Sequence, residues 1–328
     1  MKIAVPREVA PNERRVALVP EAVAKLTQMQ HQVLVQAGAG QAAYFSDDLY
    51  TRAGASLVED VQDLYQQADI VLKVQRPMEH PDLGKHEVEL LRPGSILIGF
   101  LEPLSHPDTI QKLAQRNITA FSMENIPRIA RAQRMDALSS MATVAGYKAA
   151  LLAANALPRM FPLLMTAAGT VVPARVFVVG AGVAGLQAIA TCRRLGAVVQ
   201  AYDVRPAVRE QVQSLGAKFV ELDLDTRETE DRGGYARAMD ETFYRRQREL
   251  LARVVAESDV VITTAVVPGK RAPVLITEEM VRGMPLGAVI VDLAAERGGN
   301  CELTRPGETV LIWGAGSGVG SACNTVLI

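Results

Sequence analysis

Short runs of apolar residues alternate with longer amphipathic stretches over the first third of the chain. This alternation is typical of βαβ units, in which helices connect buried parallel strands. It predicts one α/β domain that ends near residue 125. Its strands are expected at 2–6, 32–36, 69–74, 95–101 and 117–123, and its helices at 20–29 and 108–116.

The same alternation returns at Ala174 and predicts a second α/β domain. Strands are expected at 174–179, 197–203, 217–222, 259–267 and 287–294, and helices at 186–195, 206–215 and 236–258. Between the two domains, the Ala- and Leu-rich segment 135–165 is predicted to form a long connecting helix. The fold class is therefore α/β, with two doubly wound parallel-sheet domains joined by a long helix.

Composition agrees with two globular domains. The chain has 328 residues, of which 49% are hydrophobic and 22% charged, and domains average roughly 150 residues. The 35 basic and 36 acidic residues nearly cancel, which argues against nucleic-acid binding through bulk charge. The three cysteines lie far apart and form neither a disulfide framework nor a metal-binding pair. No signal peptide or membrane-spanning helix is predicted.

The strongest chemical signal is the glycine pattern that includes Gly180, Gly182 and Gly185. It follows an apolar strand and opens a helix, and Asp203 ends the next strand, as a dinucleotide-binding fingerprint requires. The glycines permit a tight turn and a close approach to the pyrophosphate, and the helix N-terminus favours phosphate. Asp203 would bind the adenosine ribose and favour NAD(H), although Arg205 could accept a 2′-phosphate. The second domain is therefore predicted to be a dinucleotide-binding, Rossmann-like domain.

Two polar segments each allow two interpretations. Residues 127–140 carry three arginines and a glutamine within one short loop, followed by Asp and Ser, so they could be a ligand-binding loop at an interdomain cleft or a solvated loop. The acidic segment 223–234 could be a plain loop or, with glycines beside Tyr235, a mobile flap.

The four histidines all lie in the first third of the chain, before the glycine pattern. A dehydrogenase that oxidises an alcohol or a hydroxy acid needs a general base for the proton that accompanies hydride. Their placement therefore favours a reaction that moves no substrate proton. Hydride exchange between two nicotinamides is such a reaction, because both reacting centres belong to the cofactors.

Several longer segments resemble the NAD(H)-binding component of proton-translocating nicotinamide nucleotide transhydrogenase, which is similar in fold to alanine dehydrogenase. They are ALVPEAV, PRIARAQRMDALSS, TAAGTVVPARVFVVGAGVAGLQAIATCRRLGA, GGYA, TTAVVPGKRAPVLITEEMV and VIVDLAAERGGNCELTRPGE. The resemblance extends to about Glu308. It implies an N-terminal Rossmann-like domain at 1–135, a NAD(H)-binding Rossmann domain at 136–308 and a cofactor in the cleft between them.

The resemblance also implies a function and partners. The chain would bind NAD(H), and hydride would pass directly between NADH and NADP+ held on a partner NADP(H)-binding domain. An integral-membrane partner would couple this transfer to proton translocation, as in the Si-specific, proton-translocating class. The chain would form a homodimer and lie in the cytoplasm, on the inner face of the bacterial cytoplasmic membrane, through its partners only.

Site residues follow from the same resemblance. The loop that would hold the nicotinamide end contains Arg128, Ile129, Ala130, Gln133, Asp136 and Ser139, of which Arg128, Gln133, Asp136 and Ser139 would be catalytic. The other cofactor-binding positions would be Gly180, Gly182, Val183, Gly185, Asp203, Val204, Arg205, Gly234, Tyr235, Gln247 and Val266. No metal site is implied.

Two alternatives remain open. An alanine dehydrogenase needs a titratable lysine and histidine where this chain has Gln75 and Glu102, although Arg15 is retained. A non-catalytic NAD(H)-binding module would also carry the glycine pattern.

The C-terminal segment 309–328 departs from the family, because a glycine-rich run follows an apolar strand where the family would return to the first domain. This run resembles the nucleotide turn of a medium-chain reductase, but too few residues follow it for a second cofactor site. A truncated, frameshifted or fused terminus is expected instead.

Overall fold

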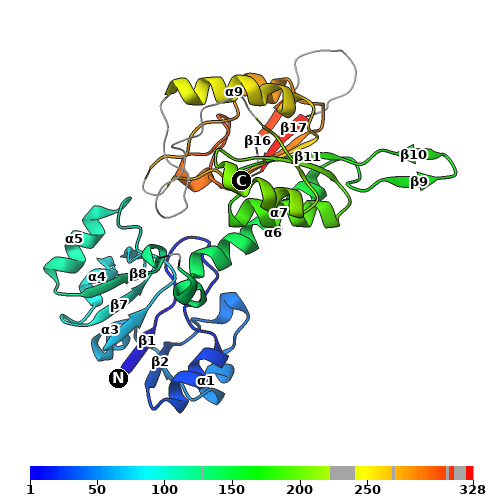
Figure 1. Cartoon of the computed structure of the whole chain (residues 1–328). Coiled ribbons are helices and arrows are strands. Elements are labelled where there is room, and N and C mark those ends of the chain that lie inside the picture. Colours follow the sequence, from blue (N-terminus) through cyan, green and yellow to red (C-terminus); the bar gives the residue numbers. More distant parts are fainter. Residues whose placement is uncertain (128, 222–240, 268–269, 308–309, 314–322, 328) are drawn as a thin grey trace. The chain divides into compact units, whose positions relative to one another are not determined.

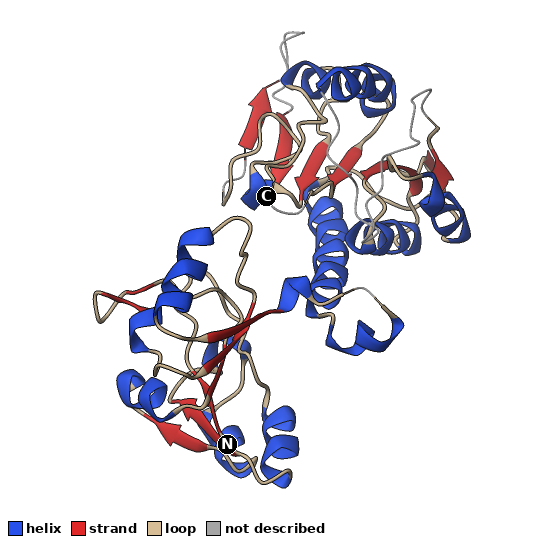
Figure 2. Ribbon diagram, turned by 60° about the vertical axis from the view of Figure 1, so that its left-hand side comes forward, coloured by secondary structure: helices blue, strands red, loops and turns tan. Residues whose placement is uncertain are grey.

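The structure, a computed structural model, describes residues 1–127, 129–221, 241–267, 270–307, 310–313 and 323–327 (Figure 1). Its contacts divide the chain into two compact units, Met1–Ala137 and Leu138–Ile328. We call them unit 1 and unit 2. Each is built on a mainly parallel sheet with helices against it, which confirms the predicted α/β class (Figure 2).

Unit 1 contains a six-stranded sheet in the order β3-β2-β1-β4-β7-β8. All of its neighbouring strands are parallel. The strands are β1 (Lys2–Val5), β2 (Gln32–Gln36), β3 (Ser56–Val58), β4 (Ile70–Leu72), β7 (Ile96–Gly99) and β8 (Thr119–Ser122). The helices are α1 (Pro20–Gln28), α2 (Asp47–Arg52), α3 (Val61–Gln67), α4 (Glu87–Leu90) and α5 (Pro107–Gln115), and β5 (Glu79–His80) pairs with β6 (Lys85–His86).

The sheet of unit 1 buries apolar side chains on both faces, as strands between two helical layers must. Ala4 and Leu34 join one buried cluster, whereas their neighbours Val5 and Val35 join another. This alternation follows from the two-residue period of a strand. The apolar runs therefore predicted five of the six strands within two residues of their ends, whereas the short edge strand β3 was not predicted.

Unit 2 contains a seven-stranded sheet in the order β13-β12-β11-β14-β15-β17-β16. Its strands are β11 (Arg175–Val179), β12 (Val198–Tyr202), β13 (Lys218–Phe219), β14 (Val260–Thr263), β15 (Val289–Asp292), β16 (Val310–Trp313) and β17 (Cys323–Leu327). Its helices are α6 (Ala137–Ala156), α7 (Val183–Arg194), α8 (Arg209–Ser214), α9 (Glu241–Ala256) and α10 (Glu278–Arg282), of which α6 begins at the last residue of unit 1.

Helix α6 contributes to the core of unit 2. Ala149, Ala150 and Ala153 are buried in the same cluster as residues of β11 and α7. At Gly146, a Cβ atom would lie only 2.0 Å from the Ala184 carbonyl oxygen, so glycine allows α6 to approach the start of α7. Of the helices that the structure describes, α6 alone is long and apolar enough to cross a membrane, a property that core helices share.

The connecting helix is shorter than predicted. Helix α6 ends at Ala156, shortly before Pro158, and a hairpin of β9 (Leu164–Thr166) and β10 (Gly169–Val171) follows. The prediction of helix to residue 165 was therefore wrong, because prolines at 158 and 162 do not continue a helix. We call this hairpin the arm, and it extends away from the sheet of unit 2 in Figure 1.

The C-terminal strands enlarge the sheet of unit 2. β17 pairs in parallel with β15, and β16 pairs antiparallel with β17. A dinucleotide turn leads from a strand into a helix. β16 is the apolar strand before the glycine-rich run, and the next element that the structure describes is the strand β17. The glycines between them lie outside the described residues.

Candidate functional site

The predicted glycine turn lies between β11 and α7, and its geometry explains each glycine. Gly180 has a φ of +99°, which favours glycine. A Cβ atom on Gly185 would lie 1.8 Å from the Gly180 carbonyl oxygen, so helix and strand could not pack as they do. At Gly182 a Cβ atom would meet only Arg205 Nη2, at 3.9 Å. The backbone at Gly182 is therefore open to a ligand, at the N-terminus of α7.

Asp203 follows β12 and faces the same turn. Its buried carboxylate accepts hydrogen bonds from Ala181 N–H (2.7 Å) and from Arg205 N–H (2.9 Å), Nε (2.9 Å) and Nη2 (2.8 Å). A carboxylate has about four acceptor positions, and these protein donors fill them. A ribose hydroxyl could hydrogen-bond to Asp203 only if one of the donors moved.

The other predicted nucleotide contacts in unit 2 differ in exposure. Val183 begins α7 and Val266 follows β14, and both side chains are exposed. Val204 is half-buried. Gln247 is only 1% exposed, and its Nε2 donates to the Tyr202 hydroxyl at 2.9 Å. Among the residues that the structure describes, its Oε1 accepts no hydrogen bond, which leaves one buried acceptor beside Tyr202.

The predicted nicotinamide loop is largely at the surface. A 3-10 helix, η3, spans Ala130–Met135, and both Ile129 and Gln133 are exposed. The Gln133 carbonyl accepts from Asp136 N–H at 3.2 Å, which ends this turn before α6. Asp136 and Ser139 are half-buried. Three predicted residues lie outside the described ranges, namely Arg128, Gly234 and Tyr235, as does the acidic segment 223–234.

A buried polar centre at the end of β15 was not predicted. The Asp292 carboxylate accepts hydrogen bonds from the hydroxyls of Thr263 (2.9 Å) and Thr304 (2.5 Å). It also accepts from the backbone N–H groups of Ala294 (2.9 Å), Asn300 (2.7 Å) and Cys301 (3.0 Å). The available signal was an aspartate at the carboxyl end of a buried strand, one residue earlier in the sheet than Asp203, which follows β12.

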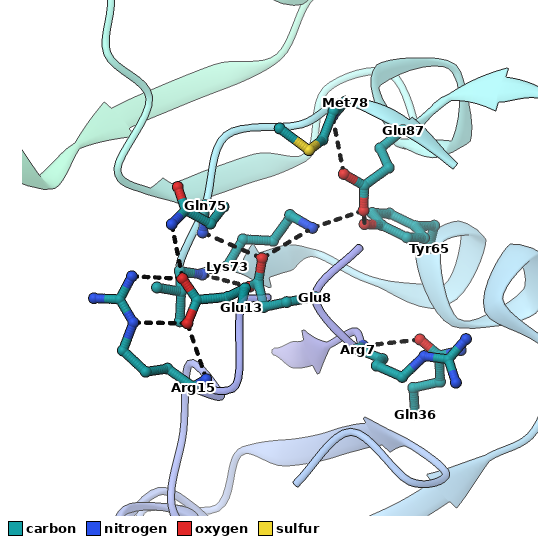
Figure 3. A network of polar contacts seen from close by, with 11 residues as sticks. Arg7, Glu8, Glu13, Arg15, Gln36, Tyr65, Lys73, Gln75, Met78 and Glu87 are labelled. Carbon is teal, nitrogen blue, oxygen red and sulfur yellow. Dashed lines mark hydrogen bonds and ion pairs between the residues drawn. The ribbon is translucent and has the colours of Figure 1, made fainter. Parts of the chain in front are cut away.

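In unit 1, Arg15 and Gln75 both contact Glu13 (Figure 3). The Arg15 guanidinium donates to Glu13 Oε1 through Nε at 2.8 Å and to Oε2 through Nη2 at 2.5 Å. Gln75 Nε2 donates to the same Oε2 at 2.7 Å. Arg15, the cation retained from the amino-acid dehydrogenase pattern, is thus already paired with an internal carboxylate.

A second network of unit 1 buries charged groups completely (Figure 3). Lys73 Nζ lies 2.7 Å from Glu87 Oε1 and 3.5 Å from Glu8 Oε2, and all three side chains are at most 2% exposed. The Tyr65 hydroxyl donates to Glu87 at 2.8 Å. Burial raises the pKa of Glu8, although Lys73 opposes this. Such a network is strongly destabilised when one partner is removed, so we assign it a structural role.

No metal site is apparent, since three or more His, Cys, Asp and Glu side chains do not gather anywhere among the described residues.

Glu102, at the second position that separates this chain from an amino-acid dehydrogenase, lies 3.4 Å from His106 Nε2. The polar groups named here in unit 1 are therefore paired within the unit.

The contribution of Glu13 to the free energy of unfolding should depend on pH. Burial raises its pKa, but hydrogen bonds from Arg15 and Gln75 outweigh burial and hold the pKa at about 2. The folded pKa lies below the ordinary value of 4.5, so this stabilisation is complete above pH 4.5 and is lost as the pH falls toward 2. We expect Glu13→Gln to lower Tm by about 3 °C at pH 7 and by much less at pH 3.

The control for this prediction is Glu21→Gln, which removes an exposed partner of Lys25. Exposed pairs contribute little, so its Tm should stay within about 1 °C of the parent at both pH values. If Glu13→Gln lowered Tm equally at pH 7 and pH 3, the low folded-state pKa of Glu13 would be contradicted.

Two family models match the chain. Alanine dehydrogenase/PNT, N-terminal domain, matches residues 4–145, and alanine dehydrogenase/PNT, C-terminal domain, matches residues 149–320. Together they cover most of both units.

Individual relatives distinguish the two branches of this family. An NAD(P) transhydrogenase subunit alpha segment of Rhodospirillum rubrum is 51% identical over 95% of this chain and 81% of its own. A transhydrogenase structure from Sinorhizobium meliloti has a TM-score of 0.83 and 42% identity, over 100% of this chain and 86% of that one. Alanine dehydrogenase of Halomonas elongata is 34% identical, over 93% of this chain and 76% of its own. The chain belongs to the alanine dehydrogenase/PNT family and is more similar to its transhydrogenase alpha subunits than to its alanine dehydrogenases.

Proposed function

We propose that this chain is the NAD(H)-binding component of a proton-translocating transhydrogenase. The observation that carries the proposal is the glycine turn at Gly180–Gly185, with Asp203 at the end of the next strand, in a chain 51% identical to a transhydrogenase subunit. The open backbone at Gly182 and the N-terminus of α7 suit a pyrophosphate. The buried acceptor of Gln247 offers a further polar contact.

The proposed reaction is a direct hydride transfer. Bound NADH supplies hydride from its ring carbon C4 to C4 of NADP+ on a partner domain, and no substrate proton moves. The residues of this chain would bind the nucleotide, orient its nicotinamide and exclude water from the reacting atoms. Gln133, at the exposed turn η3, would align the nicotinamide with the partner nucleotide, with Arg128, Asp136 and Ser139 in the same loop.

The proposed partners are an NADP(H)-binding domain and an integral-membrane proton channel. Through them the chain would lie on the cytoplasmic side of the bacterial membrane, and it would be inactive without them. A homodimer is supported by the arm, whose apolar side chains are exposed. Examples are Leu164 (39%), Met165 (78%) and Val171 (37%). Exposed apolar surface of this kind marks contact sites.

An alanine dehydrogenase-like activity is less well supported. The Gln75 carboxamide cannot titrate, and it donates to Glu13, which occupies the Arg15 guanidinium. An amino-acid oxidation needs both an acid/base group and a cation for the substrate carboxylate. Gln75 therefore does not supply the acid/base group, and Arg15, paired with Glu13, does not supply the cation.

An assay with three arms tests the proposal. The purified chain should bind NADH, and it should show no turnover with alanine plus NAD+. With a transhydrogenase NADP(H)-binding domain, NADPH and an NAD+ analogue added, it should catalyse hydride transfer. Turnover with alanine would refute the proposal, and binding without transfer in the complete mixture would favour a non-catalytic module.

Asp203→Ala should weaken NADH binding about tenfold, because it removes the acceptor proposed for the ribose hydroxyls. The measurement is a fluorescence titration with NADH. Asp203→Asn keeps one acceptor oxygen, so its loss of NADH affinity should be smaller than that of Asp203→Ala. Unchanged affinity in Asp203→Ala would remove this residue from the site.

A further inference from the structure

The Asn300 carboxamide holds both backbone polar groups of one residue, Ala265. Its side chain is fully buried, and its Oδ1 accepts from the Ala265 N–H at 2.9 Å. Its Nδ2 donates to the Ala265 carbonyl at 2.8 Å and to the Pro273 carbonyl at 2.9 Å. The carboxamide thus satisfies both backbone groups of Ala265. This fixes the chain direction just after β14.

The backbone of Asn300 is itself firmly held. Its N–H donates to Asp292 at 2.7 Å, and its carbonyl accepts from the N–H groups of Leu275 (2.8 Å) and Ile276 (3.0 Å). Gly299 precedes it with a φ of +78°, and a Cβ atom there would lie 2.6 Å from Thr304 Cβ. Asn300 is therefore a rigid support anchored to the Asp292 centre.

The segment that Asn300 supports packs against the dinucleotide turn. Thr264 Oγ1 donates to the Gly180 carbonyl at 3.0 Å, and Thr264 N–H donates to the Val179 carbonyl at 2.9 Å. Ala265 and Val266 follow directly, and Val266 is exposed. Thr264 and Ala265 therefore border the turn at the carboxyl end of β14, and Val266 follows them in the chain.

The strand order assigns this segment to one half of the nucleotide. β12, which leads into Asp203, lies on one side of β11, and β14 lies on the other. A dinucleotide crosses such a sheet with its pyrophosphate at the central turn. With the adenosine at β12, the nicotinamide half falls on the side of β14, where residues 264–266 lie.

We propose that Asn300 is a positioning residue that sets residues 264–266 against the nicotinamide half of NAD(H). This inference rests on the proposed function, because it presumes that unit 2 binds NAD(H). Without the carboxamide, the part-buried N–H and carbonyl of Ala265 would lose their partners, and such groups rearrange to recover hydrogen bonds. The segment would then shift away from the turn.

Comparing NADH with 5′-AMP tests the proposal, because AMP carries only the adenosine half. In Asn300→Ala we expect the Kd for NADH to rise about tenfold and the Kd for AMP to stay within about twofold. Thr264→Val keeps the side-chain shape but removes the hydrogen bond to Gly180. It should raise the Kd for NADH about threefold and leave the Kd for AMP unchanged. If Asn300→Ala does not fold, as a thermal melt would reveal, Thr264→Val decides the question.

The control is Thr191→Val in α7. It removes a buried hydroxyl whose hydrogen bonds go to Gln187 in the same helix, so both affinities should stay within about twofold of the parent. Equal losses of NADH and AMP binding in Asn300→Ala, or no loss of either, would overturn the inference. A parent protein that binds neither ligand would refute the proposed function itself and this inference with it.

Discussion

Gly185→Ala should lower Tm by about 10 °C and reduce NADH affinity more than about 100-fold. The added Cβ atom would lie 1.8 Å from the Gly180 carbonyl oxygen, which belongs to the backbone. This carbonyl cannot move aside as a flexible side chain could, so α7 must shift away from β11. The glycine turn would then lose its shape. A thermal melt followed by circular dichroism and an NADH titration measure the two effects.

Gly182→Ala is the matched control, because it adds the same methyl group within the same turn. Gly182 has a φ of −76°, and a Cβ atom there meets only Arg205 Nη2 at 3.9 Å. We expect Tm within about 2 °C of the parent but an NADH affinity about tenfold lower, because the methyl group keeps the pyrophosphate from the backbone. A parent-like Tm in Gly185→Ala would show that the turn tolerates what its geometry forbids.

Gln133→Asn should slow hydride transfer about 30-fold and change the Kd for NADH by less than about threefold. Asparagine keeps the carboxamide but shortens its reach by one methylene, and reacting atoms tolerate little misplacement. The exposed position of Gln133 at η3 allows this side chain to face a partner. Stopped-flow transfer with an NADP(H)-binding domain and an NADH titration provide the two values.

Gln115→Asn makes the same change at another exposed position of unit 1, at the end of α5. It should alter neither the transfer rate nor the affinity. If Gln133→Asn reduced both quantities equally, Gln133 would be a binding residue without a role in aligning the two nicotinamides.

Much of the fold was predictable because its central strands are buried on both faces. Runs such as 175–179 and 289–292 are apolar over most of their length. Short, continuous apolar runs of this kind are typical of strands covered by helices on both faces of a parallel sheet. The arm was missed for the opposite reason. Its apolar residues are exposed, so they follow neither a helical nor a strand-like burial pattern, and residues 157–165 were assigned to the preceding helix.

The site was predictable where local sequence determines geometry. The glycine turn needs only its own residues and the strand before it, so Gly180, Gly182 and Gly185 could be identified directly. Asn300 could not, because an asparagine after two glycines is typical of an ordinary turn. Its partner Ala265 is 35 residues away along the chain, and only the fold brings them together. The pairing of Arg205 with Asp203 depends on side-chain direction, which sequence does not specify.

That pairing gives the nucleotide site a built-in competitor. The Arg205 guanidinium is tethered two residues from the carboxylate it occupies, so its effective concentration there is high and constant. On the proposed function, the measured affinity for NADH is the difference between what the ribose hydroxyls gain and what Arg205 gives up. Such an exchange lowers the affinity for NADH and NAD+ alike, because both carry the same adenosine ribose, and it favours release of whichever form is bound. A subunit that must exchange its nucleotide at every turnover benefits from that compromise.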